Sequence, residues 1–166
     1  RATSQVIGLS HPPYFEKTVE ALRMLSCPRA LVIRGVEGDP ELSIGSVTRY
    51  LELQGERITP GSFHPKDAGL MMTTFKEMAG FPAEQRTKEI ELIKRLLSNE
   101  IQGGQRDWVL LNAAMLLYAA GKSTSIAGGV ATARRVVESG QAAAKLAELA
   151  APGASGGGVV QADKIP

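Results

Sequence analysis

QVIGLSHPPYFEKTVEALRMLSCPRALVIR, residues 5–34, is the stretch that decides the fold class of this 166-residue chain. Its two ends, QVIGLS and ALVIR, are short apolar runs rich in β-branched residues, a pattern that favours β-strands. Between them Phe15, Val19, Leu22 and Leu25 recur at helical spacing. Two prolines suit the start of this helix because they lack the N–H groups that a first turn leaves unpaired. A strand, a helix and a second strand with such short connections imply a parallel pair with a right-handed crossover.

The second strand continues into the polar stretch RGVEGDPELS at Arg34–Ser43. In parallel sheets, ligands bind beyond the carboxyl ends of the strands, which is where this stretch begins. It is therefore either a ligand-binding loop or a polar turn out of a buried strand, since an x-Asp-Pro sequence is typical of turns. Arg34 is a candidate phosphate-binding residue because its planar guanidinium pairs with phosphate through two hydrogen bonds. The alternative for Arg34 is an ion pair with Glu37 or Glu41.

The next segments predict an antiparallel hairpin with one solvent-facing side. In SVTRYLEL, residues 46–53, apolar side chains alternate with Thr48, Tyr50 and Glu52, which we expect to point toward water. A turn and a short strand around residues 57–59 complete the hairpin.

The remainder of the chain is predicted to be helical up to about Ala150. The first expected helix covers residues 84–100 and has an apolar stripe of Ile90, Ile93, Leu96 and Leu97. The second is a buried helix at Trp108–Ala120 that ends at Gly121. A helix capped by a serine or threonine follows, with Ile126, Val130, Ala133 and Val137 on one side, and an alanine-rich helix comes last. Residues 1–150 are thus expected to form one partial α/β domain, with a parallel-centred sheet, a following hairpin and a helical carboxyl-terminal half. The Gly-rich residues 151–166 predict a flexible tail.

The composition argues against several classes of function. The chain is 43% hydrophobic and 22% charged, which is ordinary for a soluble globular protein. Its net charge is +2, and no run of Lys and Arg exceeds two residues, so the concentrated basic face typical of nucleic-acid binders is not evident. Cys27 is the only cysteine, which excludes an internal disulfide and suits a reducing compartment. The longest apolar stretch, Trp108–Ala120, is shorter than the roughly 20 residues that span a bilayer.

Side chains typical of catalysis are sparse. His11 and His64 each precede a proline and have no second histidine or carboxylate at ligand spacing, so a structural or exposed role is expected for both. Asn112 lies in the predicted buried helix and needs hydrogen-bond partners, for which neighbouring backbone is the expected source. Because the chain begins without a methionine and almost directly in a strand, we expect a fragment or a processed chain.

Three stretches resemble a known family: RALVIRGVEGDPELS, HPKDAGL and GGQRDWVLLNAAMLLYAAGKSTSIAGGVATARRVVESGQAAAKLAEL. They are similar to the carboxyl-terminal half of anthranilate phosphoribosyltransferases, in glycosyltransferase family 3. The resemblance implies part of a nucleoside phosphorylase/phosphoribosyltransferase α/β domain. It also implies transfer of a phosphoribosyl group from phosphoribosyl pyrophosphate to anthranilate with Mg²⁺, in tryptophan biosynthesis. The implied location is the cytoplasm, or the plastid stroma in a photosynthetic eukaryote.

The resemblance further implies that this chain is inactive alone. The glycine-rich pyrophosphate loop and the anthranilate-contacting residues of the family lie upstream of the matching part, and no such loop occurs here. We therefore assign no catalytic residue. The expected partner is the amino-terminal remainder of the same protein or another chain of an assembly.

One family site falls inside the matching part. The family motif GLDE-S supplies an Asp-Glu pair that coordinates Mg²⁺ on the pyrophosphate, and this chain has GDPELS at the same place. Glu41 matches the glutamate, Pro40 replaces the aspartate, and Asp39 lies one residue earlier. The resemblance thus makes Glu41 and Asp39 candidate metal ligands. Pro40 restricts Asp39 to extended conformations, which places the standard metal site in question.

A divergent branch of the family resembles this loop more closely. Its members carry a similar RG-EG sequence after the strand, as IRGVEG does here. At least some of that branch bind nucleic acid, so the alternative interpretation is a non-catalytic paralogue that binds nucleic acid or protein. Two sets of basic residues, Arg134–Arg135 with Lys122 and Lys94–Arg95 with Lys88, are either solvated helix surface or contacts for a phosphate backbone.

Overall fold

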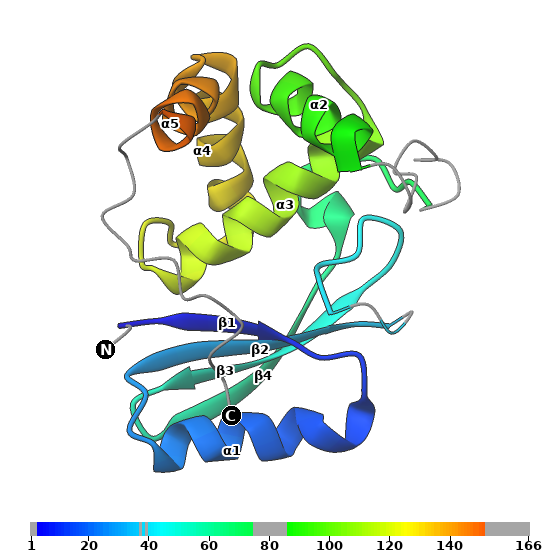
Figure 1. Cartoon of the computed structure of the whole chain (residues 1–166). Helices are drawn as coiled ribbons and strands as arrows, with labels where there is room; N and C mark the ends of the chain where they lie inside the picture. The colour runs from blue at the N-terminus through cyan, green and yellow to red at the C-terminus, as the bar shows by residue number, and fades with distance from the viewer. Residues whose placement is uncertain (1–2, 37, 39, 75–85, 152–166) are drawn as a thin grey trace.

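The computed structural model describes residues 3–36, 38, 40–74 and 86–151 as a four-stranded sheet with helices on both faces (Figure 1). The strands lie in the order β1-β2-β3-β4, with bounds Gln5–Gly8, Arg29–Gly35, Thr48–Gln54 and Arg57–Phe63. The helices are α1 (Phe15–Met24), α2 (Arg86–Leu97), α3 (Gly104–Ala119), α4 (Ile126–Glu138) and α5 (Gln141–Ala150). Short 3-10 turns occupy Pro12–Tyr14 and Pro65–Ala68. Helix α1 covers one face of the sheet, and α3 lies across the other.

The predicted strand–helix–strand unit is confirmed. Strands β1 and β2 are parallel, with Val6 beside Leu31, and α1 connects them. Leu25 is the C-cap residue of α1. The helix ends there because Ser26 adopts a positive φ of 54°, shortly before Pro28. The fold is α/β as expected, and the sheet is mixed because β3 and β4 add antiparallel to β2.

Strand β4 is longer than the sequence predicts. It continues through Pro60 and Gly61, two residues that weaken strands. As the last of the described strands in the order, β4 has an edge that no other described strand pairs with, and a proline is tolerated there. The ring of Tyr50 lies against Gly61. A Cβ atom at Gly61 would approach Cζ of Tyr50 to 2.3 Å, so the glycine makes room for the ring.

The expectation that the polar side of the hairpin faces water is wrong at Thr48 and Glu52, although Thr59 of β4 on the same side is exposed. Thr48 is 1% exposed and Glu52 is 9% exposed, because α3 covers the side on which they lie. Thr48 accepts a hydrogen bond from the backbone of Ser43, and Glu52 has three donors. Thr48 and Glu52 are polar residues on a covered part of the strand, and each has hydrogen-bond partners there, as buried polar groups do.

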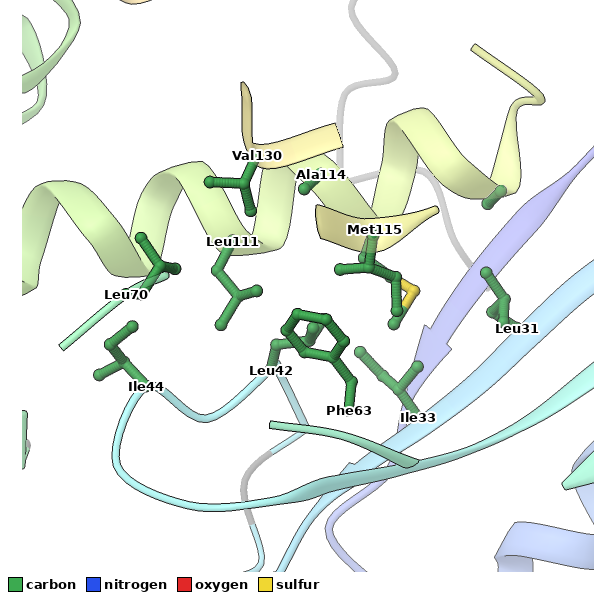
Figure 2. Packing of buried hydrophobic residues seen from close by; sticks show 12 residues of the cluster. Leu31, Ile33, Leu42, Ile44, Phe63, Leu70, Leu111, Ala114, Met115 and Val130 are labelled. Atoms are coloured by element: carbon green, nitrogen blue, oxygen red, sulfur yellow. The ribbon is translucent and has the colours of Figure 1, made fainter. Parts of the chain in front are cut away.

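Two apolar clusters hold the layers together. Figure 2 shows the larger one, in which Leu111 and Met115 of α3 point toward Leu42, Phe63 and Ile33. The smaller cluster joins α1 to the sheet through Val19, Leu22, Cys27, Ala30, Val32 and Leu53. Cys27 is buried there, as expected.

Helix α4 approaches α3 closely because Gly129 faces Ala114. A Cβ atom at Gly129 would lie 2.7 Å from the carbonyl oxygen of Ala114, so only glycine allows this contact. Ser125 caps α4 by accepting a hydrogen bond from the Gly128 N–H, as predicted. The predicted core residues of α4 are all buried.

Two helical predictions need correction. Helix α3 starts at Gly104 rather than Trp108, because Gly103 with φ of 89° forms the break and Asp107 already belongs to the first turn. In α2 only Leu96 of the predicted stripe is buried, whereas Ile90 and Ile93 are 49% and 46% exposed. No described helix is long and apolar enough to cross a membrane. The predicted tail lies outside the described residues, apart from Ala151.

Candidate functional site at the carboxyl edge of the sheet

The segment between β2 and β3 folds back over the carboxyl end of β1. The carbonyl group of Pro40 lies so close to Gly8 that a Cβ atom there would come within 1.6 Å of its oxygen. Gly8 is the last residue of β1, so this contact places the segment at the edge where the sequence predicts a ligand loop. Glu37 and Asp39 belong to this segment but lie outside the described residues.

The centre of α3 anchors the segment through Leu42. The Leu42 N–H donates to Oδ1 of Asn112 at 2.9 Å, and Nε1 of Trp108 donates to the Leu42 carbonyl at 2.9 Å. Nδ2 of Asn112 donates to the Leu42 carbonyl at 3.3 Å and to the Trp108 carbonyl at 3.0 Å. The predicted structural role of Asn112 is confirmed, and one of its two backbone partners lies 70 residues away in the chain.

A tight turn fixes the carboxyl-terminal side of the same segment. The hydroxyl of Ser43 accepts hydrogen bonds from the backbone N–H groups of Gly45 and Ser46 at 3.1 and 3.0 Å. The N–H of Ser43 donates to Oγ1 of Thr48 at 2.9 Å. Ser43 is 1% exposed, so this turn belongs to the protein interior.

Glu41 is exposed directly beside these anchors. It lines a hollow of about 260 Å³ together with Gly8, Pro40, Leu42 and Asn112. It forms no ion pair with any described residue. A free carboxylate beside a rigid backbone is the oxygen ligand that Mg²⁺ accepts, usually with one or two protein carboxylates and the substrate phosphates completing the shell. Within the described residues, no three His, Cys, Asp or Glu side chains gather in a metal-binding group.

Arg34 lies on the opposite face of the sheet from Glu41. Val32, two residues earlier in β2, packs in the α1-facing cluster, and Arg34 shares that side because side chains alternate along a strand. It lines a hollow with Phe15 and Glu16 of α1. The structure therefore does not bring Arg34 and Glu41 together, and no ion pair joins them.

A buried polar cluster, which we call the Glu52 network, was not predicted from the sequence. Glu52 accepts hydrogen bonds from Nη2 of Arg29 at 2.9 Å, from Nε2 of Gln54 at 2.7 Å and from the hydroxyl of Tyr118 at 2.8 Å. The guanidinium of Arg29 also lies 4.8 Å from the ring centre of Tyr118. Burial and the hydrogen bond to Glu52 raise the pKa of Tyr118. The two contacts of Tyr118 join α3 to the sheet, whereas Arg29 and Gln54 hold the Glu52 carboxylate from within the sheet. The network is therefore structural.

The other predicted candidates have local roles. Nδ1 of His64 accepts a hydrogen bond from the Lys66 N–H and caps a short 3-10 turn. His11 is exposed and contacts the hydroxyl of Ser10. Among the basic residues, Arg95 pairs with Glu100 at 3.4 Å, and Arg135 lies exposed on α4. Contact of these basic residues with nucleic acid stays a prediction.

The structure is an α/β domain in which the Glu41 segment lies at the carboxyl end of a parallel strand pair. The model of the glycosyl transferase family, a/b domain, matches residues 1–143. The chain therefore belongs to this glycosyl transferase family.

Named relatives and solved structures agree with this assignment. The chain is 37% identical over 150 residues to an anthranilate phosphoribosyltransferase of Leptothrix cholodnii, covering 90% of this chain and 42% of the relative. It superposes on the anthranilate phosphoribosyltransferase of Thermus thermophilus with a TM-score of 0.72 at 34% identity, covering 85% of this chain and 40% of that one. The Saccharomyces cerevisiae enzyme in complex with PRPP and Mg shares the fold, with a TM-score of 0.75, 17% identity and coverage of 87% and 41%. The chain thus spans about two fifths of the length of these relatives.

Proposed function

We propose that the chain is the carboxyl-terminal part of an anthranilate phosphoribosyltransferase-like protein of the cytoplasm. In this proposal the Glu41 segment contributes to the Mg²⁺–pyrophosphate site, and the chain alone does not turn over substrate. The observation that carries the proposal is the exposed Glu41 carboxylate, held at the carboxyl edge of the sheet by the hydrogen bonds of Leu42 to Asn112 and Trp108. The relatives that match the chain are named anthranilate phosphoribosyltransferases, which supports the substrate class.

In the proposed site, this chain contributes carboxylate oxygen ligands and the backbone segment that positions them. Glu41 would hold Mg²⁺, and Asp39 is the second candidate ligand by resemblance. When bound, the metal stabilises negative charge on a departing pyrophosphate. The fixed turn at Ser43 and the anchor at Leu42 keep Glu41 at the edge without a large entropy loss on binding.

The rest of the site would come from outside these residues. Strand β1 pairs only with β2 among the described strands, so its outer edge presents backbone groups that no other described strand pairs with. We propose that the amino-terminal remainder of the protein, or another chain of an assembly, completes the site and pairs at this edge.

A direct test measures consumption of anthranilate by the purified chain with phosphoribosyl pyrophosphate and Mg²⁺. We expect no turnover, because the chain has no glycine-rich pyrophosphate loop. Full turnover by the chain alone would contradict the proposal.

A loop exchange tests Glu41 itself. Residues 36–47 of this chain replace the corresponding segment of the Leptothrix cholodnii anthranilate phosphoribosyltransferase. We expect the exchanged protein to have reduced activity. In the exchanged segment, Pro40→Asp should raise this activity, and Glu41→Gln should abolish it. Equal activity with and without Glu41→Gln would reject the metal role.

Replacement of the family aspartate by Pro40 supports a second candidate, a non-catalytic module that binds nucleic acid. Fluorescence anisotropy with labelled single-stranded DNA and RNA tests it. If the basic residues contact phosphates, binding falls steeply as salt rises. No change in anisotropy at low salt would reject the nucleic-acid version.

A further inference from the structure

Two arginines lie directly opposite each other on the α1-facing side of the sheet. Arg34 of β2 is in register with Arg49 of β3. Both belong to the side whose apolar residues pack against α1, since Val32 and Leu51 are two positions away from them in their strands. Like charges that face each other across neighbouring strands destabilise a sheet.

Neither arginine has a neutralising partner in the described part of the chain. No ion pair there includes Arg34 or Arg49, and Nε of Arg34 is buried without a hydrogen-bond partner. Arg29, Arg106 and Arg134 also have buried Nε atoms. Arg29 and Arg106 reach a carboxylate through another nitrogen, on Glu52 and Glu138 respectively, whereas Arg134 forms no ion pair with a described residue. Arg34 thus lacks the carboxylate partner that Arg29 and Arg106 have, and the side chain opposite it in the sheet is a second, exposed arginine.

The pair opens onto a hollow of about 350 Å³ at the amino end of α1. Apolar side chains of Pro12, Phe15, Leu51 and Pro60 form its walls. Glu16, exposed in the first turn of α1, is the one carboxylate among its lining residues. Two guanidinium groups against one carboxylate leave the hollow with a net positive charge.

We propose that this hollow binds a phosphate group, either free phosphate or a phosphomonoester, between the guanidinium groups of Arg34 and Arg49. Each guanidinium presents paired N–H donors that match phosphate oxygens, and a dianion removes the repulsion between the two cations. The site is separate from the Glu41 segment because the two lie on opposite faces of the sheet. The proposal therefore holds or fails independently of the proposed phosphoribosyltransferase function.

The probes are inorganic phosphate and ribose 5-phosphate, with sodium chloride at the same ionic strength as the control for general screening. Thermal unfolding of the full chain is measured in each. We expect both phosphates to raise the midpoint temperature above the chloride value, because a ligand that binds only the folded state stabilises it. Stronger stabilisation by ribose 5-phosphate identifies a phosphomonoester as the ligand, and equal stabilisation identifies the free anion.

Variants assign the effect to the arginine pair. Arg34→Gln and Arg49→Gln should each remove the difference between phosphate and chloride, whereas Arg57→Gln, on an exposed residue of β4, should keep it. Glu16→Gln should tighten binding at least twofold, because it removes the carboxylate from the hollow. If Arg34→Gln does not fold, Arg49→Gln carries the test, since Arg49 is exposed.

A second measurement distinguishes a ligand site from a structural role. In chloride without phosphate, Arg49→Gln should unfold at the same temperature as the parent chain or higher, because one of two repelling charges is gone. Amide NMR signals of Phe15 and Leu51 should shift on addition of phosphate in the parent chain and not in Arg49→Gln. The proposal would be overturned if phosphate raised the unfolding temperature of the parent chain and of both arginine variants equally. It would also be overturned if chloride and phosphate had equal effects on the parent chain.

Discussion

Helix α3 lies on one face of the sheet and α1 on the other (Figure 1). The two faces differ in whether their arginines pair with carboxylates. On the α3 face, the partly buried Arg29 is neutralised by Glu52, whose carboxylate also accepts hydrogen bonds from Gln54 and Tyr118. The larger apolar cluster borders this network. Polar and apolar contacts together therefore fasten α3 to the sheet.

On the α1 face, apolar contacts attach the helix together with an ion pair from Arg23 to Glu56 in the turn between β3 and β4. Its ion pairs, between Arg23 and both Glu20 and Glu56, lie in solvent, and the hydrogen bond from Arg23 lowers the pKa of Glu20. Arg34 and Arg49 face α1 without a carboxylate partner among the described residues. The two faces therefore differ in how charge is neutralised: Arg29 on the α3 face has a carboxylate partner, whereas Arg34 and Arg49 on the α1 face have none among the described residues.

The largest expected effect comes from removing the centre of the Glu52 network. Glu52→Ala leaves the Arg29 guanidinium partly buried without its carboxylate, which should cost about 2–4 kcal/mol of the free energy of unfolding. Urea denaturation measures the loss. Glu52→Gln, which retains hydrogen-bonding capacity, should cost less. If Glu52→Ala lost no more free energy of unfolding than the replacement of an exposed glutamate by alanine, the proposed difference between the two faces would be wrong.

Asn112→Ala should have the next largest effect. It removes the side chain that pairs with both backbone groups of Leu42, and an unpaired buried donor costs about 1–3 kcal/mol. Leu116→Ala, on an exposed residue of the same helix, is the control. In the loop-exchange protein, release of this anchor should also weaken Mg²⁺-dependent activity. Equal stability of the two variants would show that Asn112 does not hold the segment.

Tyr118→Phe should reveal a pH dependence specific to the α3 face. Burial and the bond to Glu52 raise the pKa of Tyr118, so its stabilising contribution is complete below pH 10 and is lost as pH rises through the folded-state pKa. At pH 7 the variant should be less stable by about 1 kcal/mol, from loss of one hydrogen bond. The difference should shrink toward pH 11, as followed by urea titrations at several pH values.

The exposed Tyr14 supplies the matched control, because Tyr14→Phe should leave the alkaline loss of stability unchanged. Some alkaline loss should persist in Tyr118→Phe, since burial also raises the pKa of Tyr50. A constant difference between Tyr118→Phe and the parent chain from pH 7 to pH 11 would contradict the prediction.

The smallest effect is expected on the outer side of α1. Glu20→Gln removes an exposed ion pair, and such pairs contribute little because water and salt screen them. We expect no change in the urea midpoint beyond experimental error. A clear destabilisation would show that α1 depends on surface charge after all.

Local sequence patterns predicted much of this architecture. Apolar residues at helical spacing placed α1 and α4, Ser125 marked the cap of α4, and the glycines after α3 and α4 marked their ends, because these features depend on neighbours within one turn. The Asn112 prediction was right about backbone partners, although its bond to Leu42 joins residues 70 positions apart. The Glu52 network could not be predicted, since alternation places Glu52 on one side of a strand without showing what covers that side.

By itself, the sequence determined the strand–helix–strand unit, the helical second half and the position of the Glu41 segment after a strand. These follow from backbone propensities and periodicity, which act over a few residues. Only the tertiary structure decided that α3 covers the polar side of the hairpin, that Leu42 is held by Asn112 and Trp108, and that Arg34 faces α1 beside Arg49. Those outcomes depend on which layers pack together, and packing is decided by contacts between residues far apart in the chain.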